Sequence, residues 1–144
     1  MSFLGIKNQK VILAGDSSGG NLAIGNKNFL ILQSLSLKAV TLRIIKAGLK
    51  PPQGLLMVYP CLQLDLNYAS PSCFQALDDP MLHISLLKLC IKSYVGDMKG
   101  LEDPFISPVF ASDEILEKMP PVRIITGSED PMQDDNWRLL HRLR

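Results

Sequence analysis

The sequence has few cysteines and histidines, and neither residue type is spaced as a metal site. Its three cysteines are Cys61, Cys73 and Cys90, which form no CxxC pair, and its two histidines are His83 and His141. A zinc site is therefore not expected. An odd number of widely spaced cysteines is typical of reduced, partly buried thiols in a cytoplasmic protein rather than of a disulfide framework.

The chain also lacks an excess of one charge and a long apolar run. Its 15 basic residues are balanced by 14 acidic ones, so no basic field is present to hold a nucleic-acid backbone. The block at residues 29–37 is apolar but far shorter than the ~18 residues of a membrane helix. The apolar stretch within residues 1–10 is too short for a signal peptide. We therefore expect neither nucleic-acid binding nor a transmembrane segment.

The sequence does contain short apolar runs that are each closed by glycine or proline. Those near residues 10–14, 54–59 and 121–126 are continuous rather than alternating, which is typical of parallel strands buried on both faces. Segments long enough for crossover helices lie between them, including a helix predicted over 83–94. The 144 residues fit one domain. The fold class is therefore predicted to be α/β, a parallel sheet with flanking helices.

The strongest motif directly follows the first predicted strand. Its sequence is Gly15-Asp16-Ser17-Ser18-Gly19, which satisfies G-x-S-x-G. A sharp strand-to-helix turn of this kind exposes the serine hydroxyl, and the glycines at 15 and 19 let neighbouring backbone pass closely. The helix start directs free N–H groups, including that of Ser18, at a developing oxyanion. We interpret Ser17 as a nucleophile; a purely structural glycine turn is the alternative.

Two phosphate-binding motifs fit this turn less well. A P-loop requires lysine where Asn21 stands, and the dinucleotide-binding G-x-G-x-x-G motif requires glycine where Ser17 stands. A phosphate-binding α/β module is therefore discounted. The chemistry of an activated serine needs no metal or organic cofactor, and none is expected.

An acidic cluster follows the third predicted strand. Asp130 lies just beyond the strand end, where a carboxylate could orient a histidine and stabilise its cation. It also follows Ser17 in the chain order that serine hydrolases of this type use. Alternatively, Glu129, Asp130, Asp134 and Asp135 cap the last helix, and capping is the role we expect for the last two.

Four segments of the chain, taken together, resemble one protein family. The segments are Val11–Leu22, Asp103–Pro108, Met119–Ile125 and Asp130–Asp135. In this order they resemble the hormone-sensitive lipase family of α/β-hydrolase serine esterases. The resemblance implies a partial α/β-hydrolase domain over residues 1–144, with a cap or acyl-pocket region at 64–100. It also implies that Ser17 is the nucleophile, Asp130 the triad acid and the Ser18 N–H an oxyanion donor, acting on acylglycerols or related lipid esters.

The chain departs from this family at three places. It begins after the family's His-Gly-Gly-Gly oxyanion loop, and it ends 14 residues after Asp130, before the position of the catalytic histidine. His141 falls within the last predicted helix, so we expect a helix-surface role; for His83, which precedes the acid, we expect a structural or pocket-lining role. Residues 25–38 look foreign to the family, and we interpret them as retained non-coding sequence or a mispredicted exon boundary; the alternative is that they lengthen a helix by nearly four turns.

These features predict an esterase by family that is inactive as this chain, because a serine without a base is a weak nucleophile. The alternative is a non-catalytic fragment or isoform that binds acyl ligands or protein partners. The resemblance further implies a lipid ester as substrate and association of the full-length protein with a lipid-droplet surface. We also expect poor solubility, because the first strand would present an unpaired apolar edge.

Overall fold

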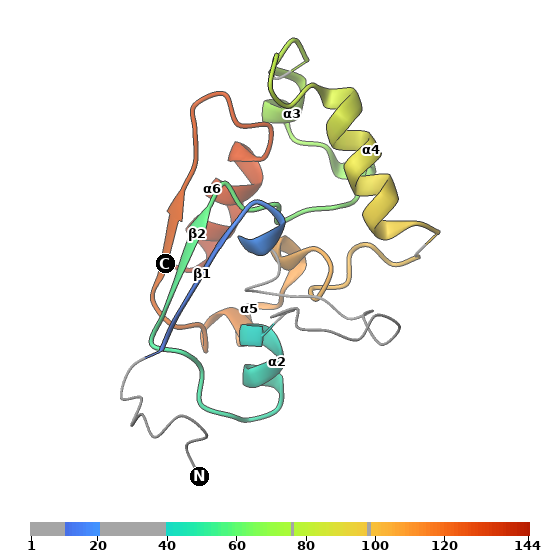
Figure 1. Ribbon diagram of the computed structural model, residues 1–144. Helices are drawn as coiled ribbons and strands as arrows, with labels where there is room; N and C mark the ends of the chain where they lie inside the picture. The colour runs from blue at the N-terminus through green and yellow to red at the C-terminus, as the bar shows by residue number, and fades with distance from the viewer. Residues whose placement is uncertain (1–10, 21–39, 76, 98) are drawn as a thin grey trace, which may run out of the picture.

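The computed structural model describes residues 11–20, 40–75, 77–97 and 99–144 (Figure 1). The elements of this part of the chain are β1 (Ile12–Asp16), α2 (Val40–Lys46), β2 (Gly54–Val58), η1 (Leu66–Tyr68), α3 (Pro71–Gln75), α4 (Ile84–Val95), η2 (Pro108–Phe110), α5 (Asp113–Leu116), β3 (Val122–Ile125) and α6 (Gln133–Arg142). Strands and helices alternate, which confirms the predicted α/β class. The suspected insertion at 25–38 lies outside the described residues.

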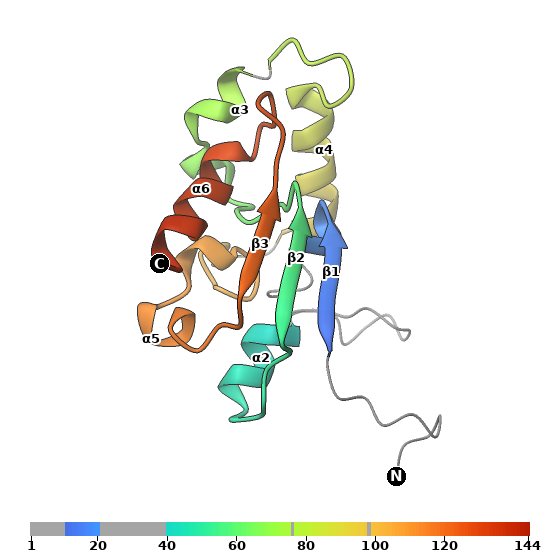
Figure 2. The same ribbon diagram turned by 90° about the vertical axis from the view of Figure 1, so that its left-hand side faces the viewer.

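The three strands form a parallel sheet in the order β1–β2–β3 (Figure 2). Ile12 of β1 pairs with Gly54 of β2, and Leu55 of β2 pairs with Val122 of β3. Because the strands are parallel and in register, their carboxyl ends meet at one edge of the sheet. This edge, at the top in Figure 2, also carries the loops that lead to the predicted site residues.

All three predicted strands are confirmed, but the first lies further along the chain than residues 10–14. Gly15 and Asp16 continue the ladder opposite Met57 and Val58, so β1 reaches the residue directly before the serine turn. The motif's first two residues therefore belong to the strand rather than to the turn. This placement fixes the start of the turn against β2.

The described helices lie on one face of the sheet, as Figures 1 and 2 show from two directions. The buried core on that face consists of Leu42, Leu55, Met57, Leu62, Phe105, Val109, Ala111, Leu116 and Leu139. On the opposite face, Ile12 is 68% exposed and Ile125 is 55% exposed. The prediction that the strands are buried on both faces is therefore wrong for β1 and β3 in the described part of the chain. Their second face has no described helix to cover it.

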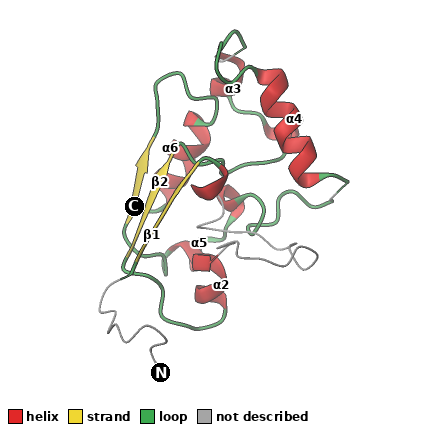
Figure 3. Cartoon of the chain, in the orientation of Figure 1, coloured by secondary structure: helices red, strands yellow, loops and turns green. Residues whose placement is uncertain are grey.

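A second apolar cluster attaches α4 to the rest of the molecule. Its buried members are Leu64, Leu87, Ile91, Val95, Ile106 and Met132. The three that belong to α4 recur every four residues, so one side of the helix is buried, as its sequence period predicts. The predicted helix at 83–94 is thus confirmed, shifted by one residue. Figure 3 shows that long loops join α4 to the elements beside the sheet.

Candidate active site

The turn after β1 holds Ser17 in a strained backbone conformation. Its φ is 48°, in the left-handed region that non-glycine residues seldom adopt. The Ser17 N–H donates to the carbonyl of Val58 at 2.9 Å, and its own carbonyl accepts from the N–H groups of Gly20 and Cys61, each at 3.1 Å. The Ser17 side chain is exposed. The surrounding hydrogen bonds therefore hold the turn in a conformation that leaves this side chain open to solvent.

Neighbouring atoms approach the backbone of this turn most closely at Gly15 and Gly20. A Cβ at Gly15 would lie 2.4 Å from the carbonyl oxygen of Gly19, and a Cβ at Gly20 would lie 2.5 Å from the Cβ of Pro60. At Gly19 a Cβ would meet Asp16 Oδ1 at 3.4 Å, close to ordinary contact. The expectation of close backbone approach is therefore confirmed for Gly15 and wrong for Gly19, where a Cβ would meet only a side-chain atom. The second site of close approach is Gly20, which lies outside the motif and which sequence reasoning missed.

A helical segment begins at Ser18, directly after the strained residue. The first N–H groups of a helix have no acceptor within the helix, so they are available to an anion. Ser18 and Ser17 line the same cavity. An oxyanion role for the Ser18 N–H stays a prediction that this arrangement permits.

Asp130 lies in the loop between β3 and α6, at the carboxyl edge of the sheet. Its Oδ2 accepts a hydrogen bond from Thr126 Oγ1 at 2.7 Å, and its Oδ1 accepts from the Met132 N–H at 2.8 Å. On α6, Asn136 Nδ2 reaches the same Thr126 oxygen at 3.5 Å. The carboxylate is thus oriented through both of its oxygens. Sequence reasoning missed Thr126, whose signal is its place at the end of a predicted strand, four residues before the acid.

The two acids predicted to cap the last helix have other roles. Helix α6 has Met132 at its N-cap, with no side-chain capping bond. Asp134 Oδ2 instead accepts from the Ser72 N–H at 2.8 Å, and the Asp134 N–H donates to Ser72 Oγ at 3.2 Å. Asp135 is buried. The capping prediction is therefore wrong, because α3 packs against the start of α6 and supplies the partner for Asp134.

Burial raises the pKa of two interacting side chains in this region. It raises the pKa of Asp135 to about 6, against an opposing effect of the Arg138 charge. Burial, followed by the charge of Asp135, raises the pKa of Cys61 to about 12. The Cys61 thiol is therefore neutral near pH 7 and a poor nucleophile. Cys61 is half-buried, Cys73 buried and Cys90 exposed, so the prediction of partly buried thiols is wrong for Cys90.

Ser17 and Asp130 line one cavity of about 790 Å³. Much of its wall comes from apolar side chains of α4 and of the chain before and after it. These are Leu64, Met81, Leu82, Leu87, Ile91 and Met132. Five of the six fall within the 64–100 region, for which the family resemblance implies an acyl pocket. The arrangement places an exposed serine and an oriented carboxylate at the border of an apolar chamber.

Tyr59 also lines this cavity and was missed by sequence reasoning. It follows β2 directly, has a positive φ of 38°, and donates its N–H to the Ile125 carbonyl at 2.5 Å. A residue before proline favours extended backbone, so its sequence position gives no sign of this conformation. Through Val58 and Cys61 the same segment is hydrogen-bonded to the serine turn. It therefore connects the serine turn with the strand that leads to Asp130.

Neither histidine lines the cavity. His83 is the N-cap of α4, and its Nδ1 accepts from the Ser85 N–H at 3.1 Å. His141 is exposed in the last turn of α6, with its ring centroid 6.2 Å from that of Trp137. The expected helix-surface role of His141 is confirmed, and of the two roles considered for His83 the structure supports the structural one.

Metal-ligand clusters and membrane-spanning helices are both absent from the described residues. No group of three or more His, Cys, Asp or Glu side chains there could hold a metal ion. In the same part of the chain, no helix combines the length and apolarity needed to cross a bilayer.

The chain is similar in sequence and structure to known esterases and lipases. Residues 2–144 match a protein family described as having the alpha/beta hydrolase fold. An esterase of Acinetobacter venetianus is 33% identical over 134 residues, which cover 93% of this chain and 38% of that protein. Hormone-sensitive lipase of Mus musculus is 37% identical over 93 residues, which cover 65% of this chain and 10% of the lipase.

Solved structures agree with these sequence matches. Carboxyl esterase 2 of the fungus Tuber melanosporum superposes with a TM-score of 0.79 at 25% identity, covering 97% of this chain and 41% of that one. A hormone-sensitive lipase from a metagenome library superposes with a TM-score of 0.71 at 31% identity, covering 92% and 38%. The chain belongs to the α/β-hydrolase family, in the group that contains hormone-sensitive lipase and its esterase relatives. It spans about two fifths of the length of the esterases that it matches.

Proposed function

We propose that this chain carries the nucleophile and acid of a serine-esterase site for acylglycerols or related lipid esters. Ser17 is the nucleophile that attacks the ester carbonyl, the Ser18 N–H stabilises the resulting oxyanion, and Asp130 orients the histidine of a triad. One observation carries the proposal: a strained, exposed serine at the end of β1 and an oriented carboxylate after β3 line a single apolar cavity. The esterase and lipase relatives support the reaction class.

The proposed mechanism uses the fold in two ways. The turn keeps the Ser18 N–H in place before the reaction, and a preorganised oxyanion donor contributes about 3 to 4 kcal/mol to transition-state stabilisation. Apolar walls supplied largely by residues 64–100 bind the acyl chain, at about 0.8 kcal/mol for each buried methylene group. On this proposal residues 1–144 form part of an α/β-hydrolase domain, and 64–100 form its acyl-pocket wall.

We expect the chain by itself to be catalytically inactive. Activation of a serine hydroxyl needs a base within hydrogen-bonding reach, and both histidines lie elsewhere, one capping α4 and one on the outside of α6. The same observation favours a second candidate function, a non-catalytic chain that binds acyl ligands or protein partners. The esterase and the acyl-binding form of the second function both place an acyl chain in the cavity. The cysteine pattern favours a cytoplasmic location, and the resemblance adds lipid-droplet association of the full-length protein.

Chemical rescue tests this function. The chain is incubated with p-nitrophenyl butyrate, with and without imidazole as an external base, and nitrophenolate release is compared with that of Ser17→Ala. Without imidazole we expect equal, background rates for both proteins. With imidazole we expect a faster rate for the parent chain than for Ser17→Ala.

Ser18→Ala is the matched control, because it removes a neighbouring hydroxyl but keeps the backbone N–H. It should retain the imidazole-dependent rate. Equal rates for the parent chain and Ser17→Ala in imidazole would contradict the nucleophile assignment. A Ser17-dependent rate without imidazole would contradict inactivity, and His141→Ala would then show whether that histidine acts as the base.

A further inference from the structure

The described residues that line the cavity beside Ser17 carry negative charges and no positive ones. Three carboxylates line it, those of Asp79, Glu129 and Asp130, and the described residues of its lining include no lysine, arginine or histidine. The rest of the lining is mainly apolar. A ligand that enters this cavity therefore meets negative charge without a compensating positive side chain from the described wall.

Asp79 is fixed at the cavity wall by its own loop. Its Oδ1 accepts hydrogen bonds from the backbone N–H groups of Met81 at 2.7 Å and Leu82 at 2.9 Å, two residues that also line the cavity. These bonds lower the pKa of Asp79, so its carboxylate is ionised at neutral pH. The negative charge is thus held in place rather than carried on a freely moving side chain.

Glu129 brings a second charge from a different loop. It lies between β3 and α6, directly before Asp130, whereas Asp79 lies between α3 and α4. Two tyrosines, Tyr59 and Tyr94, also line the cavity, and both are exposed. A phenol is not a base, so neither supplies positive charge that would offset the carboxylates.

We infer that this cavity selects esters by charge: it binds acyl esters that are neutral or carry a cationic group and rejects those that carry a negative charge, with Asp79 and Glu129 as the residues that set the selectivity. The inference rests on the proposed ester-binding function and names its substrate class. Ester hydrolysis yields an alcohol and a carboxylic acid, which loses its proton at neutral pH. The same two side chains therefore also favour release of the acid product.

The expected discrimination is moderate, because these carboxylates are partly solvated. Coulomb repulsion at a few ångströms in a mostly aqueous environment corresponds to about a tenfold difference in affinity between an anionic and a neutral ligand of equal chain length. Salt screens the interaction, so the difference should shrink at 1 M NaCl, where the Debye length is about 3 Å. A neutral ligand is not repelled by the carboxylates, so its affinity should not change with salt through this interaction.

The test is a competition experiment that needs no catalysis. Cys90 is exposed and lines the cavity, so its alkylation by iodoacetamide, followed by peptide mass spectrometry, reports occupancy. Three probes with the same alkyl chain compete: 1-octanol, octyltrimethylammonium and octyl sulfate. We expect the first two to protect Cys90 and octyl sulfate to need about ten times their concentration. In the double variant Asp79→Asn/Glu129→Gln this difference should fall below about threefold.

The Asp79→Asn substitution keeps an oxygen that can accept from Met81 and Leu82, and protection by octanol shows that the cavity is intact. Asp78→Asn is the matched control, because this exposed neighbour lies outside the cavity lining; it should keep the tenfold difference.

Equal protection of the parent chain by all three probes would overturn the charge inference and leave ester binding standing. Unchanged selectivity in the double variant would overturn the assignment to these residues. Failure of every probe to protect would overturn the proposed ester-binding function as well.

Discussion

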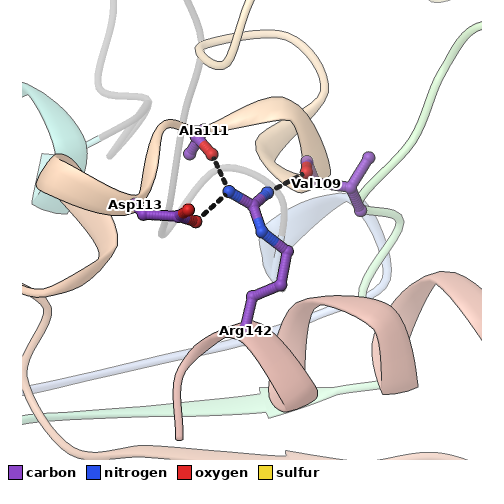
Figure 4. A network of polar contacts seen from close by, with 4 residues as sticks. All are labelled: Val109, Ala111, Asp113 and Arg142. Carbon is purple, nitrogen blue, oxygen red and sulfur yellow. Dashed lines mark hydrogen bonds and ion pairs between the residues drawn. The ribbon is translucent and has the colours of Figure 1, made fainter.

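The two ends of the sheet are built differently. At the carboxyl end, Ser17 and Tyr59 have positive φ values, and a cavity of about 790 Å³ opens between the loops. Near the amino end, one side chain fastens the last turn of α6 to the segment around α5 (Figure 4). Arg142 donates to the carbonyls of Val109 at 2.7 Å and Ala111 at 2.6 Å, and pairs with Asp113 at 2.5 Å.

This difference separates the region that carries the candidate chemistry from the region that stabilises the fold. Left-handed backbone at a non-glycine residue costs on the order of 1 to 3 kcal/mol and persists only when neighbouring structure holds it. Hydrogen bonds to the end of β2 hold the serine turn. Strand β2 also contributes Leu55 and Met57 to the buried core, which includes residues of α5 and α6. Substitutions at the two ends should therefore change stability in opposite directions.

The largest effect is expected from Arg142→Ala. Removal of the guanidinium leaves two carbonyls without their donor and breaks an ion pair, so the free energy of unfolding should fall by about 3 kcal/mol. Urea denaturation followed by circular dichroism measures the change. Lys118→Ala, which removes an exposed pair with Glu114 on the same side of the molecule, should cost less than about 0.5 kcal/mol. Equal losses of stability in the two variants would contradict the role of Arg142 in fastening α6 to the segment around α5.

A smaller effect is expected from Asp135→Asn, and it depends on pH. Because the folded-state pKa is raised to about 6 from 3.8, the folded chain binds the proton more tightly than the unfolded chain. The contribution of Asp135 to stability therefore falls as the pH rises from about 4 to about 6. The asparagine should raise the free energy of unfolding by about 2 kcal/mol at pH 7.5 and change it little at pH 4. A difference that is independent of pH would contradict a buried, titrating Asp135; the exposed Asp78→Asn serves as the control.

The smallest effect is expected from Ser17→Gly, which should increase stability. Glycine adopts left-handed backbone freely, so the substitution should add about 1 kcal/mol to the free energy of unfolding. Ser18→Gly, one residue on in helical backbone, should instead lower it by a few tenths of a kcal/mol. Thermal unfolding of both variants tests the contrast. A loss of stability in Ser17→Gly would mean that the turn is unstrained.

The sequence predicted the strands and the serine turn because local patterns determine them. Apolar runs closed by glycine or proline mark strands, and G-x-S-x-G specifies a turn that few other motifs share. Contacts between distant segments have no such local pattern. Nothing near Asp134 indicates that it binds Ser72, 62 residues away. For the same reason the left-handed Tyr59 and the need for glycine at position 20, against Pro60, emerge only from the folded chain.

The burial of the strands shows a further limit of local patterns. A continuous apolar run predicts that both faces of a strand are covered, but what covers them is a property of the whole fold. Ile12 and Ile125 are exposed because the described helices lie on the other face.

The most direct test of the account is to look for the acyl-enzyme itself. The chain is incubated with p-nitrophenyl butyrate and imidazole, quenched with acid, and analysed by peptide mass spectrometry. We predict a butyryl group on Ser17 that disappears in Ser17→Ala and persists in Ser18→Ala. A butyryl group found on Ser18 or Cys90 instead, or none on any residue, would contradict the assignment of Ser17 as the nucleophile.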